Sequence, residues 1–510
     1  MRVRGASLMD ARLVIVPAEP GPVIPAALHG QFAEHVGAGI YDGIWVGEDS
    51  PIPNTRGLRD DVVEALRVLR IPVLRWPGGC FADAYDWRDG IGPRERRPRR
   101  VNGSWGGVIE TNAFGTHEFM DLAGLLGASA YINGNVGSGS PRQLADWMEY
   151  LTGSSDSDLA EQRRRNGRAL PWTVPYVGFG NEPWGCGGQM SAAQYAQEYR
   201  RFATFLRLPA EKSAWKIAAG AAGDDPTWTD VLMAQAGRYF DALSVHYYTL
   251  PTGDWDSKGA ATGFDEAAWI STLWRSLKLD EILRTHAAIM ERTDPKRRVA
   301  LVLDEWGTWY DPEPGDKPSA LRQQNTLRDA LSAAVSLNVL HAHGDRVRMA
   351  NIAQLANVLQ AMVLTKEDRM VLTPTYHVFA MYRAFQAATS LRFELECREY
   401  RIGEIHVPAL AASVAVDAAG TLHAALVNLH PEESAALRVQ VQGNRPQQAA
   451  GRTLTAAEMD GRNTFDRPHH VKPTPFDAIR AEGNDLIVEL APKSVTVLSF
   501  GITGGIARVD

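Results

Sequence analysis

The middle of the chain alternates short apolar runs with longer amphipathic segments. From about residue 26 onward, the apolar runs predict β-strands and the amphipathic segments predict helices. In residues 60–69, for example, Val62, Leu66 and Leu69 fall on one helical face. The strand candidates are residues 27–32, 73–74, 128–132, 175–179, 216–219, 242–245, 299–303 and 346–352. Eight β–α alternations predict an α/β fold, a (β/α)8 TIM barrel that forms a catalytic domain over residues 24–387.

The two ends of the chain follow another pattern. After about residue 388, helical periodicity fades, and short alternating strands appear between Gly, Pro and Asn turns. These strands are residues 411–416, 422–428, 437–442, 485–490 and 495–500. They predict an antiparallel, jelly-roll-like β-sandwich domain over residues 388–510. Residues 11–17 contain an isolated β-type run, RLVIV, and we expect this N-terminal strand to pair with the sandwich.

A doubly wound nucleotide-binding sheet is the alternative to the barrel. Its only candidate phosphate loop is Gly137-Ser138-Gly139, which lacks the third glycine of a dinucleotide fingerprint. Residues 154–168 are polar and contain three consecutive arginines. We expect this segment to be a solvated excursion from the barrel.

Composition narrows the function classes. The 510 residues contain 53 Lys and Arg against 60 Asp and Glu, a net charge of −7, which argues against binding nucleic acid or an anionic membrane surface. No apolar run is long enough to span a membrane, and no apolar core follows the N-terminal arginines as in a secretory signal, so we expect a cytoplasmic protein. Three cysteines do not suggest a disulfide framework.

Candidate chemistry follows the predicted strands, because barrel enzymes place their active sites where strands end. Residues 180–183, GNEP, follow the fourth strand, and residues 304–307, DEWG, follow the seventh. Both segments offer a glutamate at the same rim. Two facing carboxylates can cleave a glycosidic bond, one protonating the leaving oxygen and the other attacking the anomeric carbon. We therefore predict that Glu182 and Glu305 form a catalytic pair.

Polar neighbours can support this pair. The amide of Asn181 can hydrogen-bond a sugar hydroxyl, and Arg75 can hold a carboxylate in its charged form. Tyr248 can donate to the attacking carboxylate, and His246 can tune the acid. Cys80 is expected to line the pocket rather than to act as a nucleophile, because no histidine base can be placed beside it.

A metal site is the weaker hypothesis. His341 and His343 form an HxH pair near Asp345, but they end a helical pattern, so we expect them to be structural. The chain has no HExxH or EF-hand pattern. We expect no metal and no organic cofactor.

Longer motifs make the chain resemble a known family over nearly its whole length. They are HGQFAEH (29–35), YDGIWVGE (41–48), RWPGGCFADAYDWRDGIGP (75–93), ETNAFGTHEFM (110–120), GFGNEPWGCGG (178–188), SVHYY (244–248), LDEWGTWY (303–310), RVRMANIAQLANVLQAM (346–362) and TPTYHVFAMY (373–382). With these segments in this order, the chain resembles the α-L-arabinofuranosidases of glycoside hydrolase family 51.

The resemblance implies roles for single residues. Glu182 would be the general acid/base and Glu305 the nucleophile of a retaining enzyme that forms a covalent arabinosyl-enzyme, which predicts carboxyl groups about 5–5.5 Å apart. The positions that would shape the arabinose subsite are Glu34, Arg75, Asn181, His246, Tyr248 and Gln354. Cys80 would touch the sugar, and Trp105 and Trp306 would form walls of the site. Family members often assemble as hexamers, so a homo-oligomer is expected.

These implications predict an exo-acting enzyme that removes terminal α-L-arabinofuranosyl residues from arabino-oligosaccharides and arabinoxylan fragments. The Gly-rich residues 250–264 follow the sixth strand, where loops set preference beyond the terminal sugar. Three alternatives stay open. They are an endo-β-glycanase on the same barrel, a related furanosidase or xylosidase, and a non-catalytic carbohydrate-binding protein, which would be expected to lack one glutamate.

Overall fold

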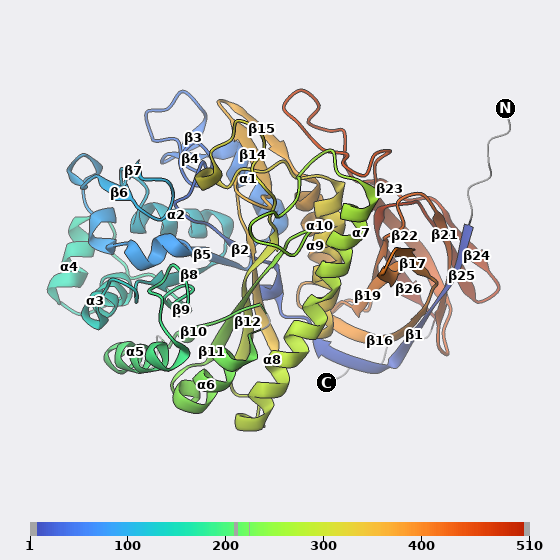
Figure 1. Cartoon of the computed structure of the whole chain (residues 1–510), viewed down its shortest axis with the longest axis horizontal. Coiled ribbons are helices and arrows are strands. Elements are labelled where there is room, and N and C mark those ends of the chain that lie inside the picture. Colours follow the sequence, from blue (N-terminus) through green and yellow to red (C-terminus); the bar gives the residue numbers. More distant parts are fainter. Residues whose placement is uncertain (1–7, 209–212, 224, 504–510) are drawn as a thin grey trace.

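Eight parallel strands close into a barrel, which lies to the left of a second, strongly curled sheet in Figure 1. The computed structural model describes residues 8–208, 213–223 and 225–503. Residues 1–7, which belong to the segment searched for a secretory signal, lie outside these ranges. The barrel strands are β2 (Gly30–Phe32), β5 (Val73–Trp76), β8 (Ser129–Gly134), β9 (Tyr176–Phe179), β10 (Trp215–Ala222), β11 (Ala242–Thr249), β12 (Ala300–Thr308) and β13 (Val347–Ala353). The predicted barrel is confirmed, and the doubly wound alternative is wrong.

Helices surround the barrel, and several begin at the capping residues that the sequence offers. Ser140 caps α3 and Thr326 caps α9, each with a reciprocal bond from the third helical residue. Gly127 ends α2 in the left-handed conformation, which glycine adopts without strain. The helices are α1 (Asp60–Leu69), α2 (Thr116–Leu126), α3 (Pro141–Thr152), α4 (Asp158–Arg165), α5 (Ala192–Phe205), α6 (Pro226–Ala236), α7 (Glu266–Leu277), α8 (Leu279–Thr293), α9 (Leu327–Ala342) and α10 (Pro374–Tyr382). Short 3-10 turns span Ala26–His29, Cys80–Ala84, Trp87–Gly90, Arg94–Arg96, Gly237–Tyr239, Pro318–Ala320 and Arg383–Phe385.

The second sheet has ten strands and takes in the N-terminal strand, as predicted. Strand β1 (Leu8–Val23) pairs antiparallel with β16 (Thr389–Glu396) but parallel with β21 (Ser434–Val441). The sheet is therefore mixed, and the expectation of a purely antiparallel arrangement is wrong. No hairpin turn joins β1 to either neighbour, so its direction is free to be parallel.

The sequence predicted the largely buried strands after residue 388 better than the exposed ones. The predicted strands correspond to β19 (Leu410–Val416), β20 (Leu422–Asn428), β21, β25 (Asp485–Leu490) and β26 (Ser494–Ile502). The missed strands are β16, β22 (Pro446–Leu454), β23 (Thr474–Pro475), β24 (Ile479–Glu482) and the hairpin of β17 (Glu399–Ile402) and β18 (Ile405–Pro408). Most residues of β22, β23 and β24 are not buried, so the apolar alternation there is weak. Small hairpins on the barrel comprise β3 (Asn54–Thr55) with β4 (Leu58–Arg59), β6 (Arg100–Asn102) with β7 (Val108–Glu110), and β14 (Val363–Lys366) with β15 (Arg369–Leu372).

Helix α9 joins the barrel to the second sheet. It packs against α7 and α10 and also contacts β19, β20 and β26. Nearly all of its side chains are buried, which explains why small and apolar residues occur all round the helix. His341 of α9 bonds Ser413 of β19, whereas His343 bonds Asp280 of α8. The two histidines therefore serve separate structural contacts.

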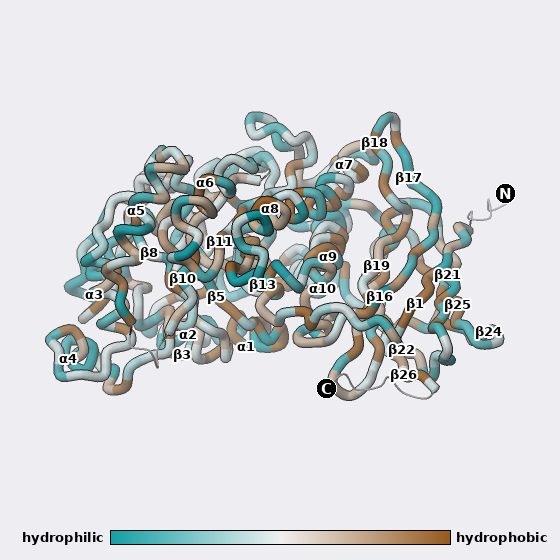
Figure 2. Tube along the Cα trace, turned by 90° about the horizontal axis from the view of Figure 1, so that it is seen from below, coloured by the Kyte–Doolittle hydropathy of each residue, from teal (hydrophilic) through white to brown (hydrophobic). Residues whose placement is uncertain are grey.

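Residues 154–168 are not a simple solvated excursion. They contain α4, which lies at the end of the molecule farthest from the second sheet (Figures 1 and 2). The side chain of Arg163 is buried and donates to the carbonyl oxygens of Tyr150 and Gly153 at the end of α3. The first arginine of the run thus satisfies helix carbonyls, while Arg165 is exposed. No helix within the described ranges is long and apolar enough to cross a membrane.

The position of β1 inside the sheet gives a stability prediction. Leu13 is fully buried between Leu395 and Val439, so Leu13→Ala should lower the free energy of unfolding by about 2–5 kcal/mol. Urea unfolding followed by tryptophan fluorescence measures this change. Arg12→Ala, which removes the half-exposed neighbouring side chain, is the matched control and should cost less than about 1 kcal/mol. Equal losses would mean that β1 is not a core strand.

Candidate functional site

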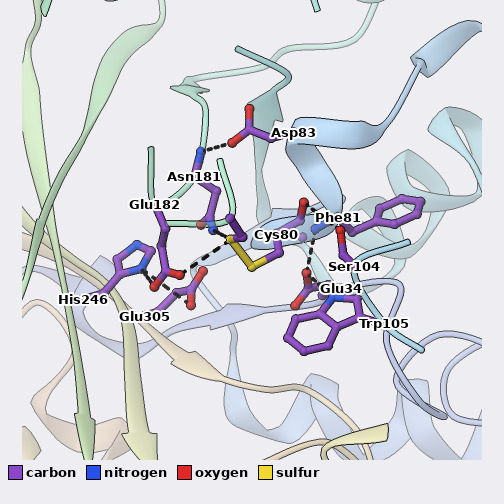
Figure 3. Close-up of a disulfide and its surroundings, with 12 residues drawn as sticks. Glu34, Cys80, Phe81, Asp83, Ser104, Trp105, Asn181, Glu182, His246 and Glu305 are labelled. Atoms are coloured by element: carbon purple, nitrogen blue, oxygen red, sulfur yellow. Dashed lines mark hydrogen bonds and ion pairs between the residues drawn. A yellow bond between two sulfur atoms is a disulfide. The ribbon is translucent and has the colours of Figure 1, made fainter. Parts of the chain in front are cut away.

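The two predicted carboxylates lie together at the carboxyl end of the barrel. Glu305 belongs to β12, and Glu182 follows β9. One oxygen of each carboxylate and one ring nitrogen of His246 lie within 4.8 Å of one another. Figure 3 shows the three side chains converging from different strands. The structure thus brings together groups that are 123 residues apart in the sequence.

Glu305 lies in surroundings that favour its charged form. The guanidinium of Arg75 donates to its Oε1 over 2.7 Å, and the hydroxyl of Tyr248 donates to its Oε2 over 2.8 Å. His246 Nδ1 lies 3.6 Å from Oε2. Burial opposes ionisation of this carboxyl, but His246 and Arg75 outweigh it, so the pKa of Glu305 lies below its ordinary value. An ionised Glu305 is suited to nucleophilic attack.

Glu182 is held by its own loop and by His246. Its φ of 42° lies in the left-handed region, which turns the side chain sharply at the end of β9. Its Oε1 lies 3.0 Å from His246 Nδ1. Burial would lower the pKa of His246, but the charges of Glu305 and Glu182 raise it above the ordinary value. The histidine therefore tends to carry positive charge between two carboxylates.

Asp83 braces the loop that carries Glu182. Its Oδ2 accepts the backbone N–H of Asn181 over 2.6 Å, and its Oδ1 accepts those of Val136 and Gly137. One buried carboxylate thereby joins the loops that follow β5, β8 and β9. The side chain of Asn181 in turn accepts a bond from Arg75 over 2.7 Å. The backbone and the side chain of Asn181 are both fixed before any substrate arrives.

Glu34 closes one end of the site. Its Oε1 accepts bonds from the backbone N–H of Phe81 and the indole N–H of Trp105, and its Oε2 accepts one from Gln354. Burial, followed by the nearby charge of Glu305, raises the pKa of Glu34 to about 7. This carboxyl can therefore donate or accept a hydrogen bond near neutral pH.

A disulfide joins Cys80 to Cys186 across the mouth of the barrel (Figure 3). The three cysteines do not form a disulfide framework, but the sequence did not predict this single bridge. An odd, sparse set argues against a framework of bridges, but one bridge needs only two residues that the fold brings together. These two are 106 residues apart in the sequence, whereas their Cα atoms are 5.5 Å apart. Cys397 is free.

A cavity of about 890 Å³ connects these groups. Of the predicted site residues, those that line it are Glu34, Cys80, Trp105, Asn181, Glu182, His246, Tyr248, Glu305 and Gln354. Arg75 is fully buried and acts on the site through Glu305 and Asn181. Trp306 is not among the lining residues and instead packs on Phe379. Side chains alternate along a strand, so when Glu305 points into the site its neighbour points outward.

The sequence reasoning missed other residues of the cavity. Trp184, Trp255 and Trp309 line it, and Trp255 and Trp309 contact each other edge to face. Trp184 lies two residues after Glu182, inside the motif GFGNEPWGCGG. Trp309 lies four residues after Glu305, inside the motif LDEWGTWY. Trp255 lies in the Gly-rich loop 250–264. The position of this loop indicated a role in substrate preference but did not indicate which residue faces the cavity. Asp83 carried no sequence signal of its bracing role.

Comparison with known proteins agrees with this geometry. Two family models match the chain, the α-L-arabinofuranosidase 1 domain over residues 65–267 and the α-L-arabinofuranosidase C-terminal domain over residues 304–494. The intracellular exo-α-L-arabinofuranosidase of Bacteroides ovatus is 47% identical over 97% of this chain and 96% of its own length. The crystal structure of the GH51 arabinofuranosidase from Xanthomonas axonopodis pv. citri covers 96% of this chain and 100% of its own, with 50% identity and a TM-score of 0.95.

The chain belongs to the α-L-arabinofuranosidases of glycoside hydrolase family 51. The arabinose complex of the Thermotoga maritima α-L-arabinofuranosidase is also similar, with 30% identity, a TM-score of 0.85 and coverage of 96% of this chain and 99% of that one. This arabinofuranosidase is therefore a glycoside hydrolase, and the alternative of a non-catalytic binding protein is wrong.

The contact between Tyr248 and Glu305 gives a prediction for this arabinofuranosidase. Tyr248→Phe removes a donor that favours the carboxylate, so the pKa of Glu305 should rise. The acid limb of kcat/KM should therefore move to higher pH, and kcat/KM should fall roughly 10–100-fold. The measurement is kcat/KM across the acidic range on 4-nitrophenyl α-L-arabinofuranoside.

Tyr247→Phe is the matched control for this measurement. The hydroxyl of Tyr247 donates to the backbone carbonyl of Arg275 rather than to Glu305, so the acid limb should keep its position. An unmoved limb in Tyr248→Phe would contradict the assignment of that limb to Glu305.

Proposed function

We propose that the protein is a retaining, exo-acting α-L-arabinofuranosidase in which Glu305 is the nucleophile and Glu182 the general acid/base. The observation that carries the proposal is the close approach of the two carboxylates, whose oxygens lie within 4.8 Å of each other. Retaining enzymes need carboxyl groups about 5–5.5 Å apart, whereas inverting enzymes need about 6.5–9.5 Å to admit a water molecule. The short separation supports retention.

In the first step, a carboxylate oxygen of Glu305 attacks the anomeric carbon of the arabinofuranosyl residue. The bond from that carbon to the leaving oxygen breaks, and Glu182 gives its proton to this oxygen. Arg75 and Tyr248 hold Glu305 ionised and oriented before the attack. The products are a covalent arabinosyl-enzyme and the shortened oligosaccharide.

In the second step, Glu182 acts as a base. It removes a proton from a water molecule, whose oxygen attacks the anomeric carbon and releases Glu305 as a carboxylate. Two inversions give net retention. His246 contacts both glutamates and carries positive charge more readily than an ordinary histidine, so it offsets the negative charge that alternates between them.

We infer that the terminal sugar binds in the part of the cavity beside Glu34. Glu34, Trp105 and Gln354 form a hydrogen-bonded wall on one side of the carboxylates, and the side chain of Cys80 lies beside them. We infer that this wall and the amide of Asn181 bind the arabinofuranosyl ring. A wall beside the reacting carbon leaves room for a chain end rather than for the middle of a polymer.

Three further tryptophans line the cavity. Trp184, Trp255 and Trp309 offer flat aromatic faces, which suit sugar rings. We infer that they receive the remainder of arabino-oligosaccharides or arabinoxylan fragments. Trp255 is 54% exposed and lies on the loop after β11, so this loop is where linkage preference would be set.

The proposal extends to domains, assembly and compartment. We infer that residues 24–387 form the catalytic domain, and that residues 388–510 with the N-terminal strand 11–17 form the second domain. We further infer a homo-oligomer, a hexamer by family resemblance, which light scattering of the purified protein would test. The Bacteroides ovatus relative is named intracellular, which supports a cytoplasmic location for this enzyme as well.

The nucleophile prediction tests the proposed function directly. Glu305→Ala should lower hydrolysis of 4-nitrophenyl α-L-arabinofuranoside roughly 10⁴-fold or more, because no covalent intermediate can form. Azide should restore turnover by entering the space left by the carboxylate, and the product should be the β-configured arabinofuranosyl azide. Glu404→Ala, at the exposed turn of the β17–β18 hairpin, is the matched control and should behave as the parent enzyme.

A substrate panel separates the remaining alternatives. The β-D-xylopyranoside and β-D-galactofuranoside of 4-nitrophenol and a soluble β-glucan should be turned over far more slowly than the arabinofuranoside. Rapid, Glu305-dependent cleavage of the glucan would overturn exo-action in favour of an endo-β-glycanase. An α-configured azide product would mean that Glu305 is the acid/base and not the nucleophile.

The acid/base prediction depends on the leaving group. Glu182→Ala should hardly slow substrates with acidic phenol leaving groups in the first step, because these depart without protonation. Arabino-oligosaccharides should lose roughly 10²–10⁴-fold in kcat/KM. The measurement is a series of aryl arabinofuranosides of increasing phenol pKa. An equal loss for every leaving group would rule out the assigned role.

A further inference from the structure

The disulfide lies directly beside the proposed acid/base. Cys186 Sγ is 3.7 Å from Glu182 Oε2 and 3.8 Å from the amide nitrogen of Asn181. The two sulfur atoms and one oxygen of Glu182 all lie within 4.8 Å of one another. In Figure 3 the sulfur–sulfur bond and the carboxylate of Glu182 face each other across a short gap. Two potential thiolates and one carboxylate are thus preassembled around one point.

This arrangement has the dimensions of a zinc site. Zinc binds cysteine sulfur at about 2.3 Å and carboxylate oxygen at about 2.0–2.2 Å, so its tetrahedral ligand atoms lie about 3.4–3.8 Å apart. Opening the disulfide would let the two sulfur atoms separate toward that distance, while the oxygen of Glu182 already lies at it. A water molecule from the cavity can supply the fourth ligand. Soft thiolate ligands favour zinc and related metals over magnesium or calcium.

The charge around the gap favours a cation. The acidic groups that line the cavity beside it are Glu182, Glu305 and Glu34. The basic groups nearby are Arg75, whose guanidinium is engaged by Asp304, Glu305 and Asn181, and His246, which contacts both glutamates. Two thiolates would add further negative charge, so a divalent cation would restore balance.

Small reagents can reach the bridge. Cys186 is exposed, and Cys80 lines the cavity of about 890 Å³. Disulfides are rare in reducing compartments, and we have proposed that this enzyme works inside the cell. Both the bridged and the dithiol forms are therefore relevant to its function.

We propose that reduction of the Cys80–Cys186 disulfide creates a zinc site, formed by the two thiolates and Glu182, that switches the enzyme off. A small dithiol supplies the two electrons and two protons. Its thiolate attacks Cys186 Sγ, the sulfur–sulfur bond breaks, and Cys80 leaves as a thiolate that takes up a proton. The second thiol of the reagent then closes its own disulfide and releases Cys186 as a thiol. Zn²⁺ binds with loss of both cysteine protons.

Inhibition follows from the ligand set and rests on the proposed role of Glu182. A carboxylate bound to zinc cannot donate a proton to the leaving oxygen. The bridged enzyme offers no thiolates, so zinc should leave its activity unaffected. The redox state of the bridge would thus decide whether zinc inhibits the enzyme.

Metal binding can be tested without turnover. The full-length enzyme is reduced with dithiothreitol, freed of reagent under anaerobic conditions and titrated with Co²⁺, whose thiolate complexes absorb strongly in the near ultraviolet. We expect one equivalent of Co²⁺ to produce this absorption in the reduced enzyme alone, and Zn²⁺ to displace it. Cys186→Ser should abolish the band. Cys397→Ser, which removes the free cysteine at a distant site, should leave the band and the activity unchanged.

Activity is then measured on the same samples. Zn²⁺ should lower turnover of the reduced, metal-free enzyme at least tenfold, and a chelator or reoxidation should restore it. Glu182→Gln should weaken Co²⁺ binding at least tenfold while the thiolate band persists at saturation.

The proposal fails if the reduced enzyme shows no thiolate band, if zinc inhibits the bridged and reduced forms equally, or if Glu182→Gln binds Co²⁺ as tightly as the parent. Failure of the proposed function would look different. The Co²⁺ band and its loss in Cys186→Ser would remain, whereas zinc binding would leave turnover intact and so overturn the inhibitory part.

Discussion

The buried charge of Arg75 organises the mouth of the barrel. Its side chain is fully inaccessible, so its guanidinium must be paired within the protein. It donates to Glu305 and Asn181, lies 3.5 Å from Asp304 and covers the ring of Phe32. These partners come from β12, from the end of β9 and from β2. One cation thereby fixes the relative positions of strands that meet only in the closed barrel.

Neutral hydrogen-bond donors hold the second carboxylate beside Arg75. Asp304, beside Glu305 in sequence, accepts the hydroxyl of Tyr131 from β8 and the amide of Asn351 from β13. Asp304 is therefore hydrogen-bonded inside the barrel, whereas Glu305 faces the cavity. Arg75 and Tyr248 favour the ionised form of Glu305 before substrate binds. An ionised carboxylate is what the proposed nucleophile requires.

A second set of contacts holds the loops that follow the barrel strands. Asp83 ties together the backbones that follow β5, β8 and β9, and the disulfide links the first and last of these loops. Glu182, with its left-handed backbone, lies between these two braces. The same proximity that steadies the proposed acid/base places two sulfur atoms beside it. Support and the proposed redox control thus come from one structural feature.

The sequence alone determined the barrel, the N-terminal strand of the second sheet and the carboxylate pair. These features depend on local periodicity and on the rule that barrel chemistry follows strand ends, so nearby residues such as those around Glu182 and Glu305 suffice to predict them. The resemblance added the family and the lining residues Glu34, Trp105 and Gln354. Strands with few buried residues, such as β22, carried too little alternation to be predicted.

Only the tertiary structure decided the rest. The Cys80–Cys186 bridge, the brace of Asp83 and the parallel pairing of β1 with β21 each join segments far apart in the chain. The outward direction of Trp306 and the inward direction of Trp255 and Trp309 depend on strand register and loop course. The local sequence gives the type of each side chain. The neighbours of that side chain depend on closure of the barrel, which no short segment of sequence specifies.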